Sequence, residues 1–528
     1  MRTIGADIVV LGSGPTGAAA TWRLAMAGAD VLCVERGHRL DPDAIGRGEP
    51  DWELRREGPL NPNPNIRRHR DDQPIDDAES PIKPMIASTV GGTSHHWSTH
   101  VPRFRPEDFR TKSLDGVGED WPIAYEDLAP YYEINEAMTG LAYLPGDPSG
   151  PVRQVPSKPL PSIGPHGRRV AQAFDALGWH WWVVDYTAGT EPDLPPCTHA
   201  GPCDIGCPSR RRASSDVNYL AAALKAGARL ETGLRAYRLE TDGRDRVTAL
   251  LCRSDEGDVR VEANRFVICG NGLATPWLLL NSRDDRHPQG LANSSGLVGR
   301  NLMLHPHARM DGIFEERLGT WLPGKTIGIT THEFFAAQGR WPFKRGFKMQ
   351  LGGGPSPLAI ALGAIEGRRL PFGAAHHEMQ DRLFDHAMSF TVCIEDAAEE
   401  HNRIALSETL RDQDGNPAPR MVYRLSADSR ACLDFALARA EEVLRKAGAV
   451  RTQFDPLKAQ AGFHLMGTAR MGRDAARSVV GPDGRSHDIG NLYVADASVF
   501  VTASSLNPTA TAQAFALRVA DGILGRMK

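Results

Sequence analysis

The stretch Asp7-Ile-Val-Val-Leu11-Gly12-Ser-Gly14-Pro-Thr-Gly17 decides the fold of this chain. Its first part is an apolar run with β-branched residues, typical of a buried parallel strand, and it leads directly into a glycine-rich turn. The small residues of 18–25 then predict a helix, and residues 30–35 predict a second buried strand that ends in Glu35. A strand, this turn, a helix and an acidic strand end, in that order, predict a dinucleotide-binding βαβ unit.

The three glycines of the turn have different expected roles. Gly12 permits the tight turn, Gly14 lets the backbone approach a pyrophosphate, and Gly17 allows the helix to pack closely on the strand. The pyrophosphate would lie at the positive N-terminal end of the helix, and Glu35 would accept hydrogen bonds from the adenosine ribose. The turn by itself does not distinguish FAD from NAD.

The composition of the 528 residues argues against several classes of protein. Lys and Arg total 61 against 65 Asp and Glu, a net charge of −4, which argues against nucleic acid or an anionic membrane as partner. No apolar run reaches the roughly 18 residues that a membrane-spanning helix needs. Because the first residues lead straight into a strand, no signal peptide is expected and the predicted location is cytoplasmic.

The far end of the chain favours FAD over NAD. Residues 491–498 predict a strand that ends at Asp496 and Ala497, and Asn507-Pro508-Thr509 precedes a small-residue helix over 509–525. A closing strand and helix this far from the N-terminal turn indicate a flavin domain assembled from distant segments of the chain.

Six blocks, taken in order, resemble the glucose–methanol–choline (GMC) family of flavoprotein oxidoreductases. Besides the N-terminal turn, they are 90–97 (Val-Gly-Gly-Thr-Ser-His-His-Trp), 269–276, 298–303, 464–468 and 491–525. The resemblance implies an α/β fold with a Rossmann-type FAD-binding domain and a second, β-rich substrate-binding domain. The expected FAD domain comprises 1–110, 197–310 and 456–528, and the expected substrate domain comprises 111–196 and 311–455. The residues that it assigns to FAD are Gly12, Gly14, Gly17, Glu35, Gly92, Thr93, His96, Trp97, Asp496, Ala497, Asn507 and Thr509.

The resemblance also supplies an expected catalytic pair. Oxidation of an alcohol by a flavin removes the hydroxyl proton while a hydride leaves the carbon, and histidine, with an unperturbed pKa of about 6.5, suits the task of base. His464 matches the active-site histidine of the family. Asn507 matches its second position, where an amide would bind and orient the substrate oxygen.

His96 stands at a position where pyranose oxidases attach FAD covalently to histidine. Other family members keep the same His-Trp pair without the bond, so both a covalent link and a non-covalent contact with the flavin ring are open.

Three of the eight cysteines cluster at Cys197, Cys203 and Cys207. This spacing resembles that of bacterial gluconate and glucose flavodehydrogenases, whose catalytic subunit holds an iron–sulfur cluster and passes electrons to a cytochrome. Structural thiols or a disulfide are the alternative. A small subunit and a cytochrome are expected partners if the cluster is present, and a homo-oligomer is otherwise expected.

The active-site loops of this chain resemble those of pyranose oxidases and sugar dehydrogenases. The expected substrate is therefore a sugar, a glycoside or an amino sugar, with oxygen as the electron acceptor. Aminoglycoside oxidases of antibiotic biosynthesis also belong to the family. The acidic run Glu395, Asp396, Glu399 and Glu400 would suit a cationic amino sugar, and a solvated face is its other interpretation. A flavin-fold protein without catalysis and a nicotinamide dehydrogenase remain as alternatives.

Overall fold

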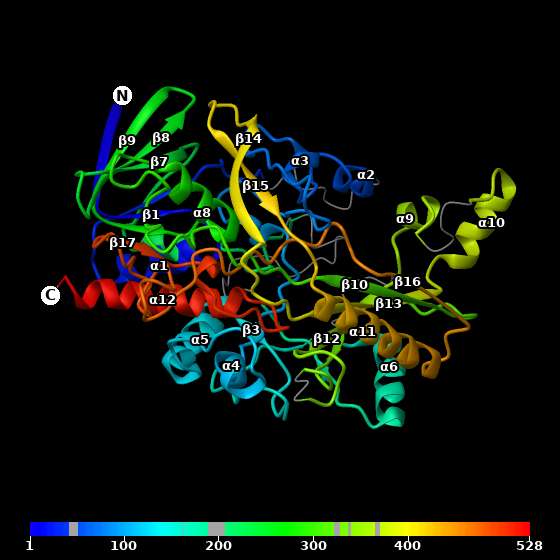
Figure 1. Cartoon of the computed structure of the whole chain (residues 1–528). Coiled ribbons are helices and arrows are strands. Elements are labelled where there is room, and N and C mark those ends of the chain that lie inside the picture. Colours follow the sequence, from blue (N-terminus) through cyan, green and yellow to red (C-terminus); the bar gives the residue numbers. More distant parts are fainter. Residues whose placement is uncertain are drawn as a thin grey trace.

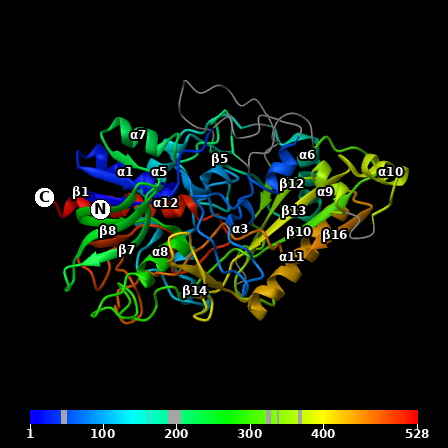
Figure 2. The same ribbon diagram turned by 90° about the horizontal axis from the view of Figure 1, so that it is seen from above.

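The computed structural model describes residues 1–41, 51–160, 162–187, 206–207, 209–320, 328–335, 339–364 and 370–527 (Figure 1). Two sheets lie at opposite ends of the molecule, with both chain termini at the end of the first (Figure 2). Among the described residues, no helix is both long and apolar enough to cross a membrane.

The first sheet begins as the sequence predicts. Strand β1 (Arg2–Leu11), helix α1 (Pro15–Met26) and strand β2 (Val31–Val34) follow one another, and β1 pairs parallel with β2. All four residues of β2 are buried, as expected for a strand covered on both faces. β1 starts five residues before the predicted strand, because its first half pairs with β9.

Distant segments complete this sheet. Its strand order is β6-β2-β1-β9-β8-β7, and β17 pairs parallel with β9, which brings residues 492–494 beside 266–268. The further strands are β6 (Arg229–Glu231), β7 (Arg235–Thr241), β8 (Val247–Ser254), β9 (Gly257–Ile268) and β17 (Leu492–Val494). The prediction that a C-terminal strand closes an α/β flavin-type sheet is therefore confirmed.

Helices from five parts of the chain pack around the first sheet. α12 (Thr509–Gly525) contacts both α1 and α5 (Tyr125–Thr139), and α7 (Tyr219–Lys225) contacts α1. α8 (Asn271–Asn281) follows β9 directly. The packing of α5 differs from the predicted division of the chain. Leu128 and Tyr132 of α5 belong to the core of the first sheet, although 111–196 was expected in the substrate domain. The domain division itself stays a prediction.

The second sheet is antiparallel, with the order β16-β10-β13-β12-β11-β4. Its strands are β4 (Trp182–Val183), β10 (His307–Ile313), β11 (Ile329–Thr331), β12 (Phe347–Gly353), β13 (Ala387–Ile394) and β16 (Arg451–Asp455). Successive side chains of a strand point to opposite faces. One face carries Ala308, Met310, Met349 and Val392, which pack in a core with α11 (Ala427–Lys446) and α6 (Gly164–Leu177).

The opposite face of the second sheet is polar. It presents alternate residues of its three long strands: His307, Arg309, Lys348, Gln350, Thr391 and Cys393. In register, His307 and Lys348 lie on either side of Cys393, which makes one row across three strands. This alternation places a line of polar side chains against the cavity described below.

Two small sheets and several short helices fill the remaining described segments. β14 (Arg403–Arg411) pairs with β15 (Pro417–Val422), and β3 (Leu141–Ala142) pairs with β5 (Tyr186–Thr187). The short helices are α2 (Trp52–Arg56), α3 (Pro64–Arg67), η1 (Gly92–His95), η2 (Pro106–Phe109), α4 (Thr111–Asp115), α9 (Pro357–Ala361), α10 (Ala374–Leu383) and η4 (Ala497–Val499).

Candidate active site

A cavity of about 1140 Å³ is lined by the turn after β1, by the 86–100 segment and by the polar face of the second sheet. Twelve of the thirteen residues expected to bind FAD or react line it: Gly12, Gly14, Glu35, Gly92, Thr93, His96, Trp97, His464, Asp496, Ala497, Asn507 and Thr509. The thirteenth, Gly17, lies behind the turn. The structure thus brings the sequence-predicted site residues together, from segments almost 500 residues apart.

The turn after β1 has no room for side chains at two of its glycines. A Cβ on Gly17 would lie 1.9 Å from the carbonyl oxygen of Gly12. Gly12 itself has a φ of +97°, and a Cβ there would lie 2.5 Å from the carbonyl oxygen of Cys269. α1 begins immediately afterwards, so the first N–H groups of the helix, which lack partners within it, stand beside the cavity.

Glu35 lies at the end of β2, as predicted, and the protein already holds its carboxylate. One oxygen accepts from the N–H and the hydroxyl of Ser13, at 2.8 and 2.6 Å, and the other accepts from the N–H of Gly37 at 2.9 Å. Burial raises its pKa, while these three donors act in the opposite direction. The carboxylate is therefore fixed in orientation at the edge of the cavity.

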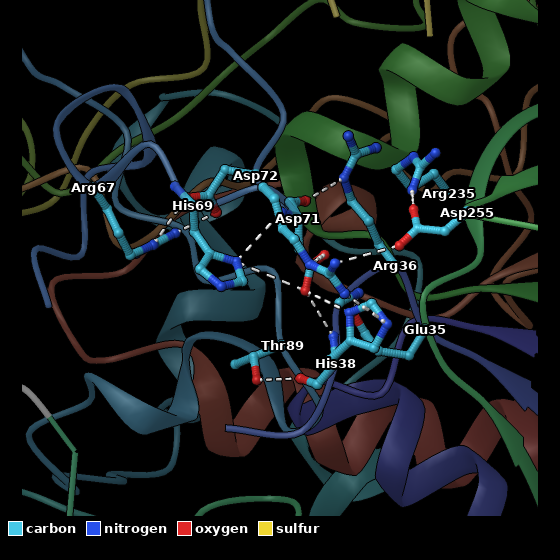
Figure 3. A network of polar contacts seen from close by, with 12 residues as sticks. Glu35, Arg36, His38, Arg67, His69, Asp71, Asp72, Thr89, Arg235 and Asp255 are labelled. Carbon is cyan, nitrogen blue, oxygen red and sulfur yellow. Dashed lines mark hydrogen bonds and ion pairs between the residues drawn. The ribbon is translucent and has the colours of Figure 1, made fainter. Parts of the chain in front are cut away.

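The segment 51–84 is tied to this end of the site. The Asp71 carboxylate accepts from the N–H of His38 at 3.0 Å and lies 2.8 Å from its Nδ1, and Arg36 donates to the carbonyl of Asp71 (Figure 3). Asn61 and Gln73 are buried and line the cavity. The described part of the polar segment 38–84 therefore forms a wall of the site.

Asp496 joins the closing strand to the segment after β9. One carboxylate oxygen accepts from the N–H of Asn271 at 2.9 Å and from the hydroxyl of Thr275 at 2.6 Å, and the other accepts from the N–H of Ser498 at 2.8 Å. Both oxygens are thus used within the protein, and Asp496 is held in place at the cavity wall; its contact with FAD stays a prediction.

His464 contacts a second histidine, His305, which the sequence analysis missed. His305, which is fully buried, has its Nδ1 2.8 Å from Nδ1 of His464 and its Nε2 2.8 Å from the carbonyl oxygen of Ser504. A carbonyl only accepts, so Nε2 of His305 carries the proton. Burial first, and then the Lys348 charge, lower the pKa of His305 to about 4.

The tautomer of His464 follows from this pairing. Because His305 is neutral and protonated on Nε2, its Nδ1 accepts, and His464 must donate from Nδ1. Burial and the charges nearby hold the pKa of His464 well below its usual value. Nε2 of His464 is therefore unprotonated, and no described residue forms a hydrogen bond with it. His464 therefore has a ring nitrogen that can accept a proton, in a residue that lines the cavity.

Lys348 is the second residue that sequence reasoning missed. It is 3% exposed, and its ammonium donates to Oδ1 of Asn507. That bond orients the amide so that the Asn507 oxygen faces Lys348, and the NH₂ group is left to donate elsewhere. The alternation of β12 is visible in the sequence, but nothing local in it shows which face meets Asn507.

The cysteine cluster lies mostly outside the described residues. Cys197 and Cys203 are not described, and Cys207 is half-buried, lines the cavity and has its Sγ 3.3 Å from Oγ of Ser209. Among the described residues, no group of three or more His, Cys, Asp or Glu side chains is placed to hold a metal ion. The iron–sulfur cluster stays a prediction.

The acidic run at 395–400 does not line the cavity in the described structure. Glu395 pairs with the buried Arg345 at 2.8 Å, and Asp396 accepts from the hydroxyl of Tyr423 at 2.8 Å. Burial raises the pKa of both carboxyls to about 7. The expectation that this run meets a cationic amino sugar is thus not supported, and the alternative of a solvated face is wrong for Glu395 and Asp396.

Comparison with known proteins identifies the family. Residues 11–307 match the N-terminal model and residues 398–516 the C-terminal model described as GMC oxidoreductase. The chain belongs to the GMC oxidoreductase family. This is a family of FAD-dependent flavoproteins, and the predicted resemblance is confirmed.

Curated relatives of this GMC oxidoreductase match over nearly their whole length. A 2-methyl-1,2-propanediol dehydrogenase from Mycolicibacterium austroafricanum is 33% identical and covers 98% of this chain and 95% of its own. The fructose dehydrogenase large subunit of Gluconobacter japonicus is 29% identical, covering 100% and 99%. Paromamine 6'-oxidase from Streptomyces fradiae is 30% identical, covering 98% and 91%.

A solved structure shares the fold of this GMC oxidoreductase. Pyridoxine 4-oxidase from Mesorbium loti matches with a TM-score of 0.66 at 17% identity, covering 98% of this chain and 99% of that one. This likeness shows the fold, and the family match shows that the chain is an oxidoreductase, as the sequence predicted.

Proposed function

We propose that this GMC oxidoreductase binds FAD along the cavity and oxidises a CH–OH group of a sugar, glycoside or polyol to a carbonyl. The observation that carries the proposal is the contact of Nδ1 of His464 with His305, which leaves Nε2 as the basic nitrogen of a residue that lines the same cavity as Asn507. The names of the relatives, which include a diol dehydrogenase, a fructose dehydrogenase subunit and an aminoglycoside oxidase, support this substrate class.

The residues present fit FAD. The Gly12–Gly14 turn and the start of α1 would receive the pyrophosphate, and Glu35 stands where the ribose hydroxyls would lie. Several buried polar atoms of cavity-lining residues, among them Nε1 of Trp97 and Nδ1 of His307, have no hydrogen-bond partner within the described residues. Orphaned polar atoms of this kind are expected where a ligand completes the site. The bound flavin would supply the hydride acceptor.

His464 would take the proton of the substrate hydroxyl on Nε2. Its Nδ1–H bond to His305 holds the ring in place and fixes the tautomer, so that the base needs no rearrangement before reaction. The NH₂ group of Asn507, turned away from Lys348, would donate to the reacting oxygen. The Lys348 ammonium, which donates a hydrogen bond to Asn507, would stabilise the negative charge that develops on that oxygen.

Three finer points belong to the same proposal. Oxygen is the proposed acceptor, and a cytochrome is the alternative if Cys197, Cys203 and Cys207 hold an iron–sulfur cluster. His96 lines the cavity next to Trp97, where a covalent bond to FAD would form if there is one. Iron and acid-labile sulfide assays, and flavin colour in the acid-precipitated pellet, test the cluster and the covalent bond respectively.

The proposal is tested by anaerobic flavin reduction. Purified protein is mixed with D-glucose, D-fructose, a methyl glycoside or propane-1,2-diol, and the flavin absorbance is followed in a stopped-flow instrument. At least one of these probes should bleach the flavin. His464→Ala should retain bound FAD but reduce it 10²- to 10⁴-fold more slowly, roughly the usual contribution of a general base. Reduction of the His464→Ala flavin at the parent rate would contradict the base assignment.

Bleaching by NADH alone, with none of the alcohols active, would contradict the substrate class. A protein that purifies without flavin and cannot be reconstituted with FAD would contradict the cofactor assignment.

A further inference from the structure

One ring nitrogen of His100, a further histidine that lines the cavity, has no partner among the described residues. His100 is 4% exposed and lines the cavity, and its Nδ1 lies 2.7 Å from Oδ1 of Asp185. The Asp185 carboxylate also accepts from the N–H of Val101 at 3.1 Å and pairs with Arg153, and these partners keep it ionised. Nδ1 of His100 therefore donates, and its Nε2 presents a lone pair.

This lone pair is unsatisfied. Nε2 of His100 is buried and has no hydrogen-bond partner in the part of the chain that the structure describes. A buried acceptor left without a donor costs free energy, so its presence at a cavity wall points to a ligand that completes it. None of the reaction steps assigned above uses His100.

Lys348 complements this acceptor with donors. The ammonium carries three N–H groups, of which one donates to Asn507. His100 and Lys348 both line the cavity, and burial first, then the Lys348 charge, lowers the pKa of His100. The cavity wall thus offers both a buried acceptor and a buried donor, and the donor is bonded to the amide proposed to hold the reacting oxygen.

We propose that His100, oriented by Asp185, and Lys348 form a subsite for a second hydroxyl group of the substrate, close to the hydroxyl that is oxidised. This rests on the proposed function and narrows its substrate class to vicinal diols, including sugars. A hydroxyl donates one hydrogen bond and accepts others, so it can donate to Nε2 of His100 and accept from Lys348 at the same time.

Other substituents fit this pair less well. A carboxylate would suit Lys348 but would place its negative charge against the lone pair of His100. An ammonium, as in an amino sugar, would suit His100 but would face the like charge of Lys348. An apolar substituent would leave both groups unsatisfied. The hydroxyl satisfies the two together.

The test compares substrates that differ by one hydroxyl. Anaerobic flavin reduction is measured for propane-1,2-diol against propan-1-ol, and for D-glucose against 2-deoxy-D-glucose, and the ratio of kcat/KM within each pair is reported. The wild-type enzyme should prefer the diol of at least one pair by about tenfold or more, because a site built for a hydroxyl rejects the analogue without it.

Two variants then test whether His100 and Lys348 cause the preference for the substrate with the second hydroxyl. His100→Phe keeps a ring of similar size but removes the lone pair, and Lys348→Met keeps the length of the side chain but removes the ammonium. In each, the ratio should fall towards one, whatever happens to the absolute rates. Lys344→Met, the same substitution at an exposed lysine four residues away, serves as the matched control and should keep the parent ratio.

Each outcome decides the matter. A wild-type ratio near one in both pairs, or variants that slow both members of a pair equally, would overturn the subsite while leaving the proposed oxidation intact. Equal slowing by Lys348→Met would instead assign Lys348 to the positioning of Asn507. If no probe, including those of the proposed-function test, reduces the wild-type flavin, the proposed function fails and the subsite falls with it.

Discussion

The glycine-rich end of the cavity and its second-sheet end are built in different ways. The first is made from the turn 12–17, Glu35 and the start of α1, all within 24 residues of one another, and it offers mainly backbone groups. The second places His100, Lys348, His464 and Asn507 together, from four segments spread over 400 residues, and it offers side chains. A local motif can therefore be recognised in the sequence, whereas a site built from distant segments can be recognised only in the folded molecule.

The two ends also differ in how they satisfy polar groups. Both oxygens of Glu35 have donors from the protein, whereas Nε2 of His100 and Nδ1 of His307 have none among the described residues. The glycine-rich end is thus largely pre-formed for a ligand common to a whole family. The second-sheet end leaves hydrogen-bonding atoms that the protein does not use and that the substrate can use. This is where family members can differ in specificity.

The largest effect is expected from breaking the glycine-rich end. Gly17→Ala places a Cβ 1.9 Å from the carbonyl oxygen of Gly12, backbone that cannot move without opening the turn. The variant should lose bound FAD completely, as seen by the flavin-to-protein absorbance ratio. Gly522→Ala is the matched control, since nothing lies within 4 Å of a Cβ there, in helix α12. Normal FAD content in Gly17→Ala would show that the turn does not approach the cofactor.

The next effect concerns the tautomer of the base. His305→Leu removes the acceptor that holds Nδ1–H of His464, and flavin reduction should slow about 100-fold or more, because a base in the wrong tautomer is ineffective. His305→Gln should recover most of the rate, since its amide can accept from His464 and donate to the Ser504 carbonyl.

The readout that separates positioning from structure is the pH profile of kcat. His305→Leu should alter the apparent pKa of the base, while FAD content stays at the parent value. If His305→Leu and His305→Gln lose the same activity, His305 does not act through its two nitrogens.

The smallest effect is on stability against pH. The folded pKa of His305 is about 4 and its ordinary value is 6.5, so the unfolded chain binds a proton over that range and the folded protein does not. His305 therefore costs stability as the pH falls from 6.5, by about 2 kcal/mol at pH 5 at the usual 1.36 kcal/mol per pH unit.

Thermal melting of wild type and His305→Gln between pH 7.5 and 5 measures this term. Any stability advantage of the wild type should shrink or reverse as the pH falls, because Gln does not titrate. Glu395 and Asp396, whose pKa values are about 7, act in the opposite direction in both proteins and cancel in the comparison. A difference between the two proteins that is constant over this range would show that His305 is not held neutral by burial.

The sequence by itself determined the parts of this protein that depend on short spacing. The turn 12–17 has one workable chain geometry, so its glycines predict the strand, the helix and the cavity edge around them. The order of the family blocks predicted the GMC fold, the segments that line the cavity and the His464–Asn507 pair.

Only the tertiary structure decided what lies against these residues. His305 and Lys348 stand in ordinary strand-like contexts, and neither shows in sequence that its partner is His464 or Asn507. Glu395 and Asp396 look solvated because charged residues cluster there, yet both carboxylates are buried with partners. Leu128 and Tyr132 of α5 pack in the core of the first sheet, a contact that the sequence pattern of α5 does not show. The face that a helix or strand buries is visible in its pattern, but which surface meets that face depends on contacts between residues far apart in the chain.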